Sequence, residues 1–210
     1  MSKNNNKNSQ VITAIAISAV VLALGYFLVR SAPGNLSQSA LDGGSPGAPL
    51  SGQLNSLIGN PMPAIQLADK DGKTFTLPDF KGKYTVLFFS EGLMCYPACW
   101  NQIASFGDDL RFNSDQVQAI SVVTDTAKDW QRAVDQMPRL AKATMMFDAG
   151  GNTSGQLGML TTNSSMHRGA LPGHTYVLID KDGIVKYVFD DPNMAIANDM
   201  LFNKIQEINK

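Results

Sequence analysis

Hydrophobic residues are distributed in three different ways along the chain. Residues 11–29 form an apolar run without a charge, and Arg30 closes it. Residues 31–55 are rich in Ser, Gly, Pro and Ala, and from residue 56 onward short apolar runs alternate with polar turns. The pattern predicts three parts, namely a hydrophobic helix, a linker and one folded domain at residues 56–210.

The apolar run is long enough to cross a membrane as a helix. Its nineteen residues would span about 28 Å, close to the roughly 30 Å hydrocarbon core of a bilayer. Because Lys3 and Lys7 precede the run, the positive-inside rule places residues 1–10 in the cytoplasm and the folded domain on the other side. We therefore expect a single-pass membrane protein anchored by residues 11–30. A signal peptide cleaved in the small-residue stretch at 39–40 is the alternative.

Residues 31–55 are expected to form a flexible linker. Their composition offers too little apolar surface to offset the entropy that the chain would lose on ordering. Such a segment would tether the folded domain to the membrane at a distance.

The domain at residues 56–210 alternates strand patterns with helix patterns. Its apolar runs predict strands at 64–69, 74–79, 85–90, 117–125, 144–149, 175–180 and 184–190. Helices are predicted at 97–111, 127–137 and 193–208. Because a Lys-Asp-Gly turn joins the first two strands and another joins the last two, both pairs are expected to be hairpins. This order predicts an α/β sandwich whose sheet is parallel in one half and antiparallel in the other.

Composition and charge exclude several kinds of function. The 210 residues carry 17 basic and 18 acidic side chains, and no basic run lies beyond the N-terminus, so we expect no nucleic-acid partner. With two cysteines and two histidines, the chain cannot build a multi-bridge disulfide scaffold, a four-cysteine zinc site or a three-histidine metal site. Its chemistry must therefore depend on few reactive groups.

The two cysteines lie where a strand pattern gives way to a helix pattern. Cys95 and Cys99 follow the strand predicted at 85–90, and Pro97 suits the first position of the next helix. The N-terminus of a helix carries a partial positive charge, which lowers the pKa of a nearby thiol. One helical turn between the cysteines can bring the sulfurs together, so we expect a redox or metal-binding pair. A purely structural disulfide and two inert buried thiols are the alternatives.

Three segments carry a family resemblance. They are GNPMP with the hairpin and strand that follow it at residues 59–89, the cysteine segment FFSEGLMCYPACWNQI at 88–103, and PGHTYVLIDKDGIVKYVF at 172–189. Together they resemble the thioredoxin-like redoxin superfamily, which includes peroxiredoxins and membrane-anchored thiol–disulfide oxidoreductases. The resemblance spans most of residues 57–208. It implies an α/β thioredoxin-like fold, with a mixed central sheet flanked by helices and an N-terminal β-hairpin extension.

The chain departs from these families around the cysteines. Thioredoxins have two residues between their cysteines, and this chain has three. Peroxiredoxins have Thr or Ser three residues before the peroxidatic cysteine, where this chain has Gly92 before Cys95 and Tyr96 before Cys99. Thioredoxins also place a cis-proline next to the cysteines, and either Pro172 or His174 could occupy that place here.

The three-residue spacing also resembles the Sco copper chaperones, which are membrane-anchored and thioredoxin-like and carry a distant histidine ligand. That resemblance implies Cu bound through Cys95, Cys99 and His174. Two thiolates and an imidazole suit Cu(I) chemically. Copper is therefore the alternative cofactor, whereas the main interpretation requires neither a cofactor nor a metal.

Four residues are candidates for supporting roles. His174 and Pro172 could form the wall of the site, and His174 could also transfer protons. Glu91 could shuttle protons or be a solvated acid of a loop, and Trp100 could shield the disulfide or simply pack in the core.

The resemblance implies a membrane-tethered thiol–disulfide oxidoreductase or a peroxiredoxin-like antioxidant protein. By analogy with the first cysteine of thioredoxins, Cys95 would attack a protein disulfide or a hydroperoxide, and Cys99 would resolve the intermediate. Because the sequence contains no NADPH or flavin motif, we expect a protein thiol reductant as partner. A binding module with a structural disulfide is a further alternative.

Overall fold

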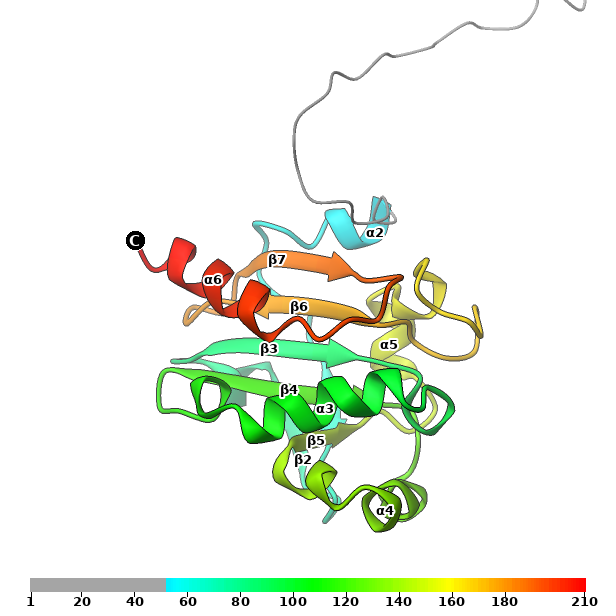
Figure 1. Ribbon diagram of the computed structural model, residues 1–210. Coiled ribbons are helices and arrows are strands. Elements are labelled where there is room, and N and C mark those ends of the chain that lie inside the picture. The colour runs from blue at the N-terminus through cyan, green and yellow to red at the C-terminus, as the bar shows by residue number, and fades with distance from the viewer. Residues whose placement is uncertain (1–51) are drawn as a thin grey trace, which may run out of the picture. The chain divides into compact units, whose positions relative to one another are not determined.

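The computed structural model describes residues 52–210 (Figure 1). The expected cytoplasmic segment 1–10, the anchor 11–30 and most of the linker 31–55 lie outside the described residues. Within residues 52–210, no helix combines the length and the apolar character that a membrane crossing requires.

The end of the expected linker is folded. Gly52–Asn55 form the short helix α2, and its Leu54 is completely buried in the same apolar cluster as Leu57 and Met62. The ordered domain therefore starts before residue 56, because this one leucine finds a place in the core.

A single mixed sheet organises residues 52–210, with the strand order β2-β1-β5-β4-β3-β6-β7 (Figure 1). The strands are β1 (Gln66–Ala68), β2 (Thr74–Thr76), β3 (Tyr84–Phe89), β4 (Val117–Val123), β5 (Thr144–Phe147), β6 (Thr175–Ile179) and β7 (Val185–Asp190). Strands β3, β4 and β5 are parallel, whereas β6 pairs antiparallel with both β3 and β7. The hairpin β1–β2 extends the parallel edge by pairing with β5. The predicted mixed sheet and its N-terminal hairpin extension are confirmed.

Helices cover both faces of the sheet. They are α3 (Ala98–Asp108), α4 (Ala127–Gln136), α5 (Asn152–Gln156) and α6 (Asn198–Ile208). In Figure 1, α3 and α6 lie in front of the sheet, and their buried side chains belong to one apolar cluster. Leu54 of α2 and Leu157, directly after α5, belong to a second cluster. The arrangement is thioredoxin-like, with the cysteines on the side of α3.

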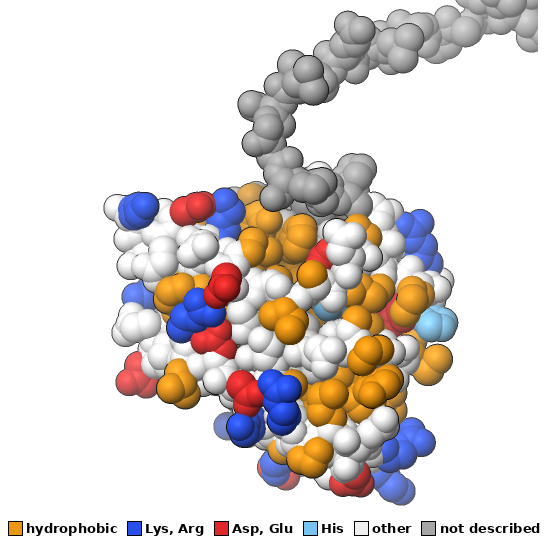
Figure 2. Space-filling model, viewed as in Figure 1, with side chains coloured by type: hydrophobic (Ala, Val, Ile, Leu, Met, Phe, Trp, Pro, Cys, Tyr) orange, Lys and Arg blue, Asp and Glu red, His pale blue; other side chains and the backbone are white. Residues whose placement is uncertain are grey.

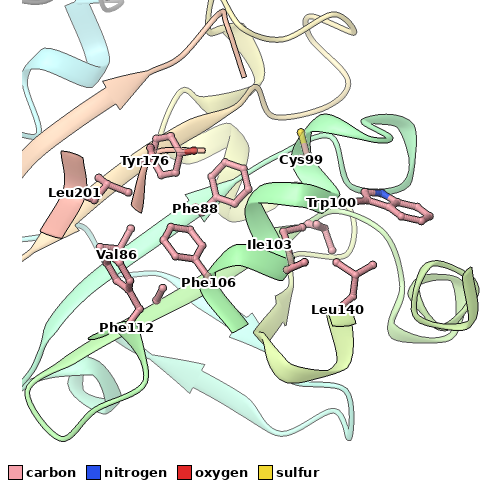
Figure 3. Packing of buried hydrophobic residues seen from close by; sticks show 14 of the residues in the cluster. Val86, Phe88, Cys99, Trp100, Ile103, Phe106, Phe112, Leu140, Tyr176 and Leu201 are labelled. Carbon is pink, nitrogen blue, oxygen red and sulfur yellow. The ribbon is translucent and has the colours of Figure 1, made fainter. Parts of the chain in front are cut away.

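Strand β3 is the centre of the core because both of its faces are covered. All six of its residues are buried. Val86 and Phe88 belong to the cluster under α3 and α6, whereas Leu87 and Phe89 belong to the opposite cluster. Alternate side chains of a strand point to opposite faces, so this continuous apolar run joins the two halves of the core. Figure 3 shows Phe88 packed near Phe106 and Tyr176.

The last helix starts later than the sequence predicts. Residues 193–197 were expected to be helical, but α6 begins at Asn198. The carboxylate of Asp191 accepts the N–H groups of Asn193 and Ala195, both at 2.9 Å, and so offers the backbone an alternative to a helix. Met194 adopts a positive φ of 51° within this turn. We name residues 191–197 the cap loop.

Candidate active site

The two cysteines lie on either side of the start of α3. Cys95 follows a 3₁₀ turn at Gly92–Met94. Cys99 is the second residue of α3, and Figure 3 shows it at the start of that helix. A disulfide joins them, with the Cα atoms 5.4 Å apart. Both are buried, with 2% of Cys95 and none of Cys99 exposed. The sulfurs meet as the spacing predicts, and Pro97 lies one position before the helix rather than at its first residue.

The turn before Cys95 is fixed by three contacts. Gly92 has φ +58°, and a Cβ there would lie 1.8 Å from Oδ2 of Asp125. That carboxylate, at the end of β4, accepts the N–H of Leu93 at 3.0 Å. The indole Nε1 of Trp100 donates to the carbonyl of Gly92 at 3.1 Å. Trp100 is thus buried and stabilises the turn before Cys95. Only glycine fits at position 92.

The two sulfurs have different neighbours. Sγ of Cys99 lies 3.4 Å from Nδ1 of His174, whereas Sγ of Cys95 lies 4.0 Å from the thioether sulfur of Met194 in the cap loop. Cys99 is also the cysteine within the first turn of the helix, where backbone N–H groups stabilise an anion. Both the imidazole and the helix terminus therefore act on Cys99.

His174 is a buried, neutral imidazole. Burial lowers its pKa from 6.5 to about 4, although the Asp191 carboxylate, a hydrogen bond to the backbone of Ala195 and the Asp190 carboxylate act in the opposite direction. Its Nε2 lies 2.7 Å from the hydroxyl of Tyr176, and its ring packs edge-on against Phe88. A neutral imidazole next to a thiol can accept its proton.

Of the two candidates, His174 contacts a cysteine, since its Nδ1 lies 3.4 Å from Sγ of Cys99. Pro172 lies in a loop before β6, and the cis peptide bond of the described residues is Tyr96–Pro97. The neighbouring Gly173 has no room for a side chain, since a Cβ would lie 2.1 Å from Oγ1 of Thr162.

Glu91 holds a loop and is not solvated. Its side chain is 1% exposed and accepts hydrogen bonds from the backbone N–H groups of Met166, at 2.6 Å, and His167, at 2.9 Å. The hydroxyl of Ser165 and Nδ1 of His167 also contact its carboxylate, at 3.2 and 2.9 Å. The solvated-acid alternative is therefore wrong, and the carboxylate holds the loop at residues 165–167 in place.

Apolar side chains gather on the surface over the N-terminal end of α3 (Figure 2). Met94 and Tyr96, on either side of Cys95, are 59% and 56% exposed, and the ring of Tyr96 rests edge-on against Trp100. The buried disulfide is therefore bordered by exposed apolar side chains.

Tyr176, Gln102 and Met194 belong to the site but were not singled out from the sequence. Gln102 lies three residues after Cys99, so a helix places both on one face. Tyr176 lies two residues after His174, so a strand does the same. These two periodicities could have identified Gln102 and Tyr176. The approach of Met194 depends on a loop and has no such signal.

One combination of residues could hold a metal. The sulfurs of Cys95 and Cys99 and a ring nitrogen of His174 all lie within 4.8 Å of one another. This is the ligand set of the copper alternative, and it would require the disulfide to be reduced.

Comparisons with known proteins give a consistent result. The model of the AhpC/TSA family matches residues 58–188. Chloroplastic peroxiredoxin Q of Triticum aestivum is 31% identical over 139 residues, which cover 63% of this chain and 58% of that protein. Peroxiredoxin Bcp of Escherichia coli K12 is 27% identical over 157 residues, which cover 71% of this chain and 95% of the relative.

A solved structure shows the same fold. Peroxidoxin BcpB from Mycobacterium tuberculosis superposes with a TM-score of 0.59 at 21% identity, covering 72% of this chain and 97% of that one. These matches do not support the Sco copper-chaperone alternative.

The neutral state of His174 predicts a pH-dependent stability of the oxidised chain. The unfolded imidazole binds a proton near pH 6.5 and the folded one only near pH 4, so between these values the unfolded state holds more protons. The free energy of unfolding should therefore fall as the pH is lowered from 6.5 to 4, by at most about 3 kcal/mol. Urea denaturation at several pH values measures it.

A histidine variant makes this measurement specific. His174→Gln should remove most of the pH dependence, because it removes the buried imidazole. An unchanged pH dependence in His174→Gln would contradict the assignment.

Proposed function

The chain belongs to the AhpC/TSA family, and on this premise we propose that it is a peroxiredoxin-like thiol peroxidase whose redox centre is Cys95 and Cys99. The observation that carries the proposal is the buried disulfide at the N-terminus of α3, in contact with the neutral imidazole of His174. An internal disulfide is the product expected when one cysteine reduces a hydroperoxide and a second condenses with it.

We assign the reaction with hydroperoxide to Cys99 and the resolving role to Cys95. A thiolate at Cys99 gains from the helix terminus, and Nδ1 of His174 is positioned to accept its proton. Cys95 precedes the helix and has a thioether as its neighbour. This assignment reverses the order expected from the analogy with thioredoxins.

The proposed oxidation needs one proton transfer in each direction. The Cys99 thiol passes its proton to His174, and the thiolate attacks one peroxide oxygen. A sulfur–oxygen bond forms and the O–O bond breaks, and the departing alkoxide takes the proton from the imidazolium and leaves as an alcohol. The Cys95 thiol then attacks the sulfenic sulfur of Cys99, which forms the disulfide and releases water.

Two electrons must return from a partner. A protein dithiol is the reductant that fits, since both cysteines of this chain are consumed in the disulfide. Its thiolate would attack one sulfur of the disulfide and release the other as a thiolate, and its second thiol would resolve the mixed disulfide. Met194 covers Cys95, so the cap loop has to move before a protein thiol reaches that sulfur.

Single cysteine variants test the assignment. With dithiothreitol as reductant, Cys99→Ser should lower the turnover of hydrogen peroxide by about a thousandfold or more, because it removes the nucleophile. Once it has been reduced and freed of dithiothreitol, Cys95→Ser should still reduce one equivalent of peroxide and then hold a sulfenic acid on Cys99, which a 1,3-diketone probe traps for mass spectrometry. Trapping on Cys95 in the Cys99→Ser variant, with turnover retained, would reverse the roles.

We also propose that residues 11–30 anchor the chain as a single membrane-spanning helix, with the redox domain outside the cytoplasm. The uncharged run at 11–29 and the preceding Lys3 and Lys7 support this proposal. The tether would place peroxide reduction next to a membrane surface, in a compartment that permits disulfides.

Cell fractionation tests the anchor. The full chain expressed in bacteria should remain in the membrane fraction after an alkaline carbonate wash, and protease added to spheroplasts should digest the redox domain. Deletion of residues 1–30 should release the chain into the soluble fraction. A mature protein shortened near residue 40 would instead establish a cleaved signal peptide.

Binding of Cu(I) is a second candidate function, favoured by the three donor atoms within 4.8 Å of one another. Thiolates and imidazole are suitable ligands for Cu(I). Because binding requires both cysteines to be reduced, copper would compete with the peroxidase cycle for the same sulfurs.

A chelator competition measures this candidate. If it is correct, the reduced chain retains one equivalent of Cu(I) against a chromogenic chelator, and the oxidised chain retains none. His174→Gln should weaken binding by about tenfold or more, in line with the loss of one of three ligands. Failure of the reduced chain to retain stoichiometric copper would exclude the site.

A further inference from the structure

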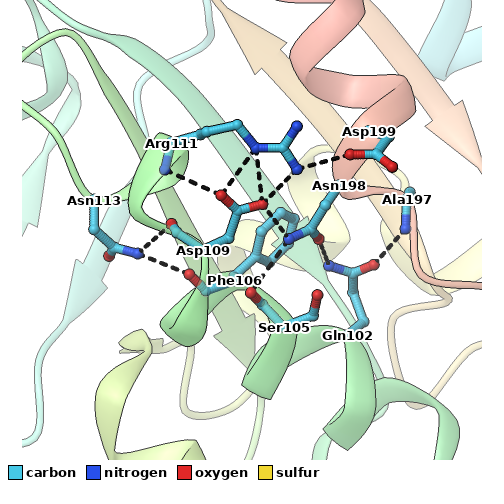
Figure 4. Close-up of polar contacts among 9 residues, drawn as sticks. All are labelled: Gln102, Ser105, Phe106, Asp109, Arg111, Asn113, Ala197, Asn198 and Asp199. Atoms are coloured by element: carbon cyan, nitrogen blue, oxygen red, sulfur yellow. Dashed lines mark hydrogen bonds and ion pairs between the residues drawn. The ribbon is translucent and has the colours of Figure 1, made fainter.

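Behind His174 lies a chain of buried side chains that reaches the surface. It runs from His174 through the Tyr176 hydroxyl to Gln102 and Asn198, and it ends at Asp109, which pairs with Arg111. Figure 4 shows the part from Gln102 to Arg111. The proposed peroxidase step requires only the imidazole. The direction of each hydrogen bond in the chain, however, decides which nitrogen of that imidazole carries the proton.

The side-chain amides of Gln102 and Asn198 each have a neighbour that fixes their orientation. The backbone N–H of Ala197 can only donate, and it donates to Oε1 of Gln102 at 2.7 Å. The carbonyl of Ser105 and the carboxylate of Asp109 can only accept, and Nδ2 of Asn198 donates to them at 3.2 and 3.0 Å. Both constraints agree with the bond between them, in which Nε2 of Gln102 donates to Oδ1 of Asn198 at 2.8 Å (Figure 4).

The amide of Gln102 then fixes the hydroxyl of Tyr176. The hydroxyl has two carbonyl oxygens as neighbours, Oε1 of Gln102 at 3.1 Å and the backbone carbonyl of Ala195 at 3.5 Å. Both only accept, so the hydroxyl donates its single proton on this side, and Gln102 is the nearer acceptor. A phenol keeps its proton at neutral pH. The phenolic oxygen is left as the acceptor for Nε2 of His174 at 2.7 Å.

The hydroxyl in turn fixes the imidazole. If Nε2 carries the single proton of a neutral ring, Nδ1 has a free lone pair, and Nδ1 is the atom 3.4 Å from Cys99. Phe88 borders both rings, with centroid distances of 4.6 Å to His174 and 4.7 Å to Tyr176.

We propose that Gln102 and Tyr176 are positioning residues, which hold His174 in the Nε2–H tautomer so that its unprotonated Nδ1 faces Cys99. The role of Cys99 in this statement rests on the proposed function. The hydrogen-bonded side chains orient the imidazole and do not conduct a proton to the surface, because Oε1 of Gln102 carries no proton to pass on. The cap loop takes part, since the N–H that orients Gln102 belongs to Ala197.

Nitrogen NMR reads the tautomer directly in the full chain, which has only two histidines. The oxidised chain is used, because Cys99 then has no proton to pass to His174. With ¹⁵N-labelled histidine in detergent at pH 7, the long-range proton–nitrogen pattern of His174 should show a protonated Nε2 and a bare Nδ1. His174→Gln assigns the signal. A proton on Nδ1, or a doubly protonated ring, would overturn the proposal.

The reactivity of Cys99 measures the consequence. In a Cys95→Ser background, iodoacetamide should modify Cys99 along a pH profile governed by its thiolate. Gln102→Leu and Tyr176→Phe should each raise the midpoint of this pH profile by about one unit, because His174 is no longer held ready to accept the Cys99 proton. Below the midpoint, modification of Cys99 should then be about tenfold slower. Gln118→Leu is the matched control, because it removes a side-chain hydrogen bond to Thr85 that lies outside this chain of residues.

The outcomes separate the two proposals. Tyr176→Phe removes only one hydroxyl, so it provides the test of the positioning role if Gln102→Leu does not fold. If both variants keep the control's profile while Cys99→Ser abolishes turnover, the positioning role is wrong and the peroxidase proposal stands. If Cys99→Ser keeps full turnover, the peroxidase assignment is wrong, and the NMR pattern still decides the tautomer.

Discussion

The redox site depends on the removal of one imidazole from water. Burial keeps His174 uncharged, and an uncharged ring has one nitrogen that donates and one that accepts. The donor side needs a buried partner, because an unsatisfied N–H in the core is costly. Tyr176 meets that need and is itself anchored by Gln102. The polar groups behind the site thus follow from a single desolvated ring beside Cys99, and the apolar cluster under α3 provides the desolvation.

Much of the fold could be predicted from sequence periodicity. The doubly buried run of β3 and the two Lys-Asp-Gly hairpins are local signals, and each corresponds to an observed element. Local signals fail where a distant or competing contact decides the structure. Leu54 orders α2 because it reaches the core, and the carboxylate of Asp191 delays α6 by binding two backbone N–H groups.

In the site, too, local signals predict some contacts, and distant contacts decide the others. The contact between Cys95 and Cys99 depends on four residues of separation and one helix start, so spacing was enough to predict it. The choice between Pro172 and His174 depends on how a loop enters β6, and the burial of Glu91 depends on residues 165–167 folding over it. With Cys99 as the proposed peroxidatic cysteine, position 96 carries Tyr where peroxiredoxins carry Thr or Ser, and its ring lies against Trp100. At Cys99 the polar neighbour is instead an imidazole contributed from the other half of the sheet.

The cap loop links two properties that are usually considered separately. Its Met194 covers Cys95, and its ends bind the site through the N–H of Asp191 on the carbonyl of His174 and the N–H of Ala197 on Gln102. A displacement of the whole loop uncovers the disulfide and breaks the bond that orients Gln102. A loop position that exposes the Cys95 sulfur therefore disfavours the orientation of His174, and a loop position that orients His174 buries that sulfur. In the proposed cycle, the closed loop suits the reaction with a small oxidant, whereas a displaced loop suits a macromolecular reductant, and each arrangement disfavours the chemistry of the other.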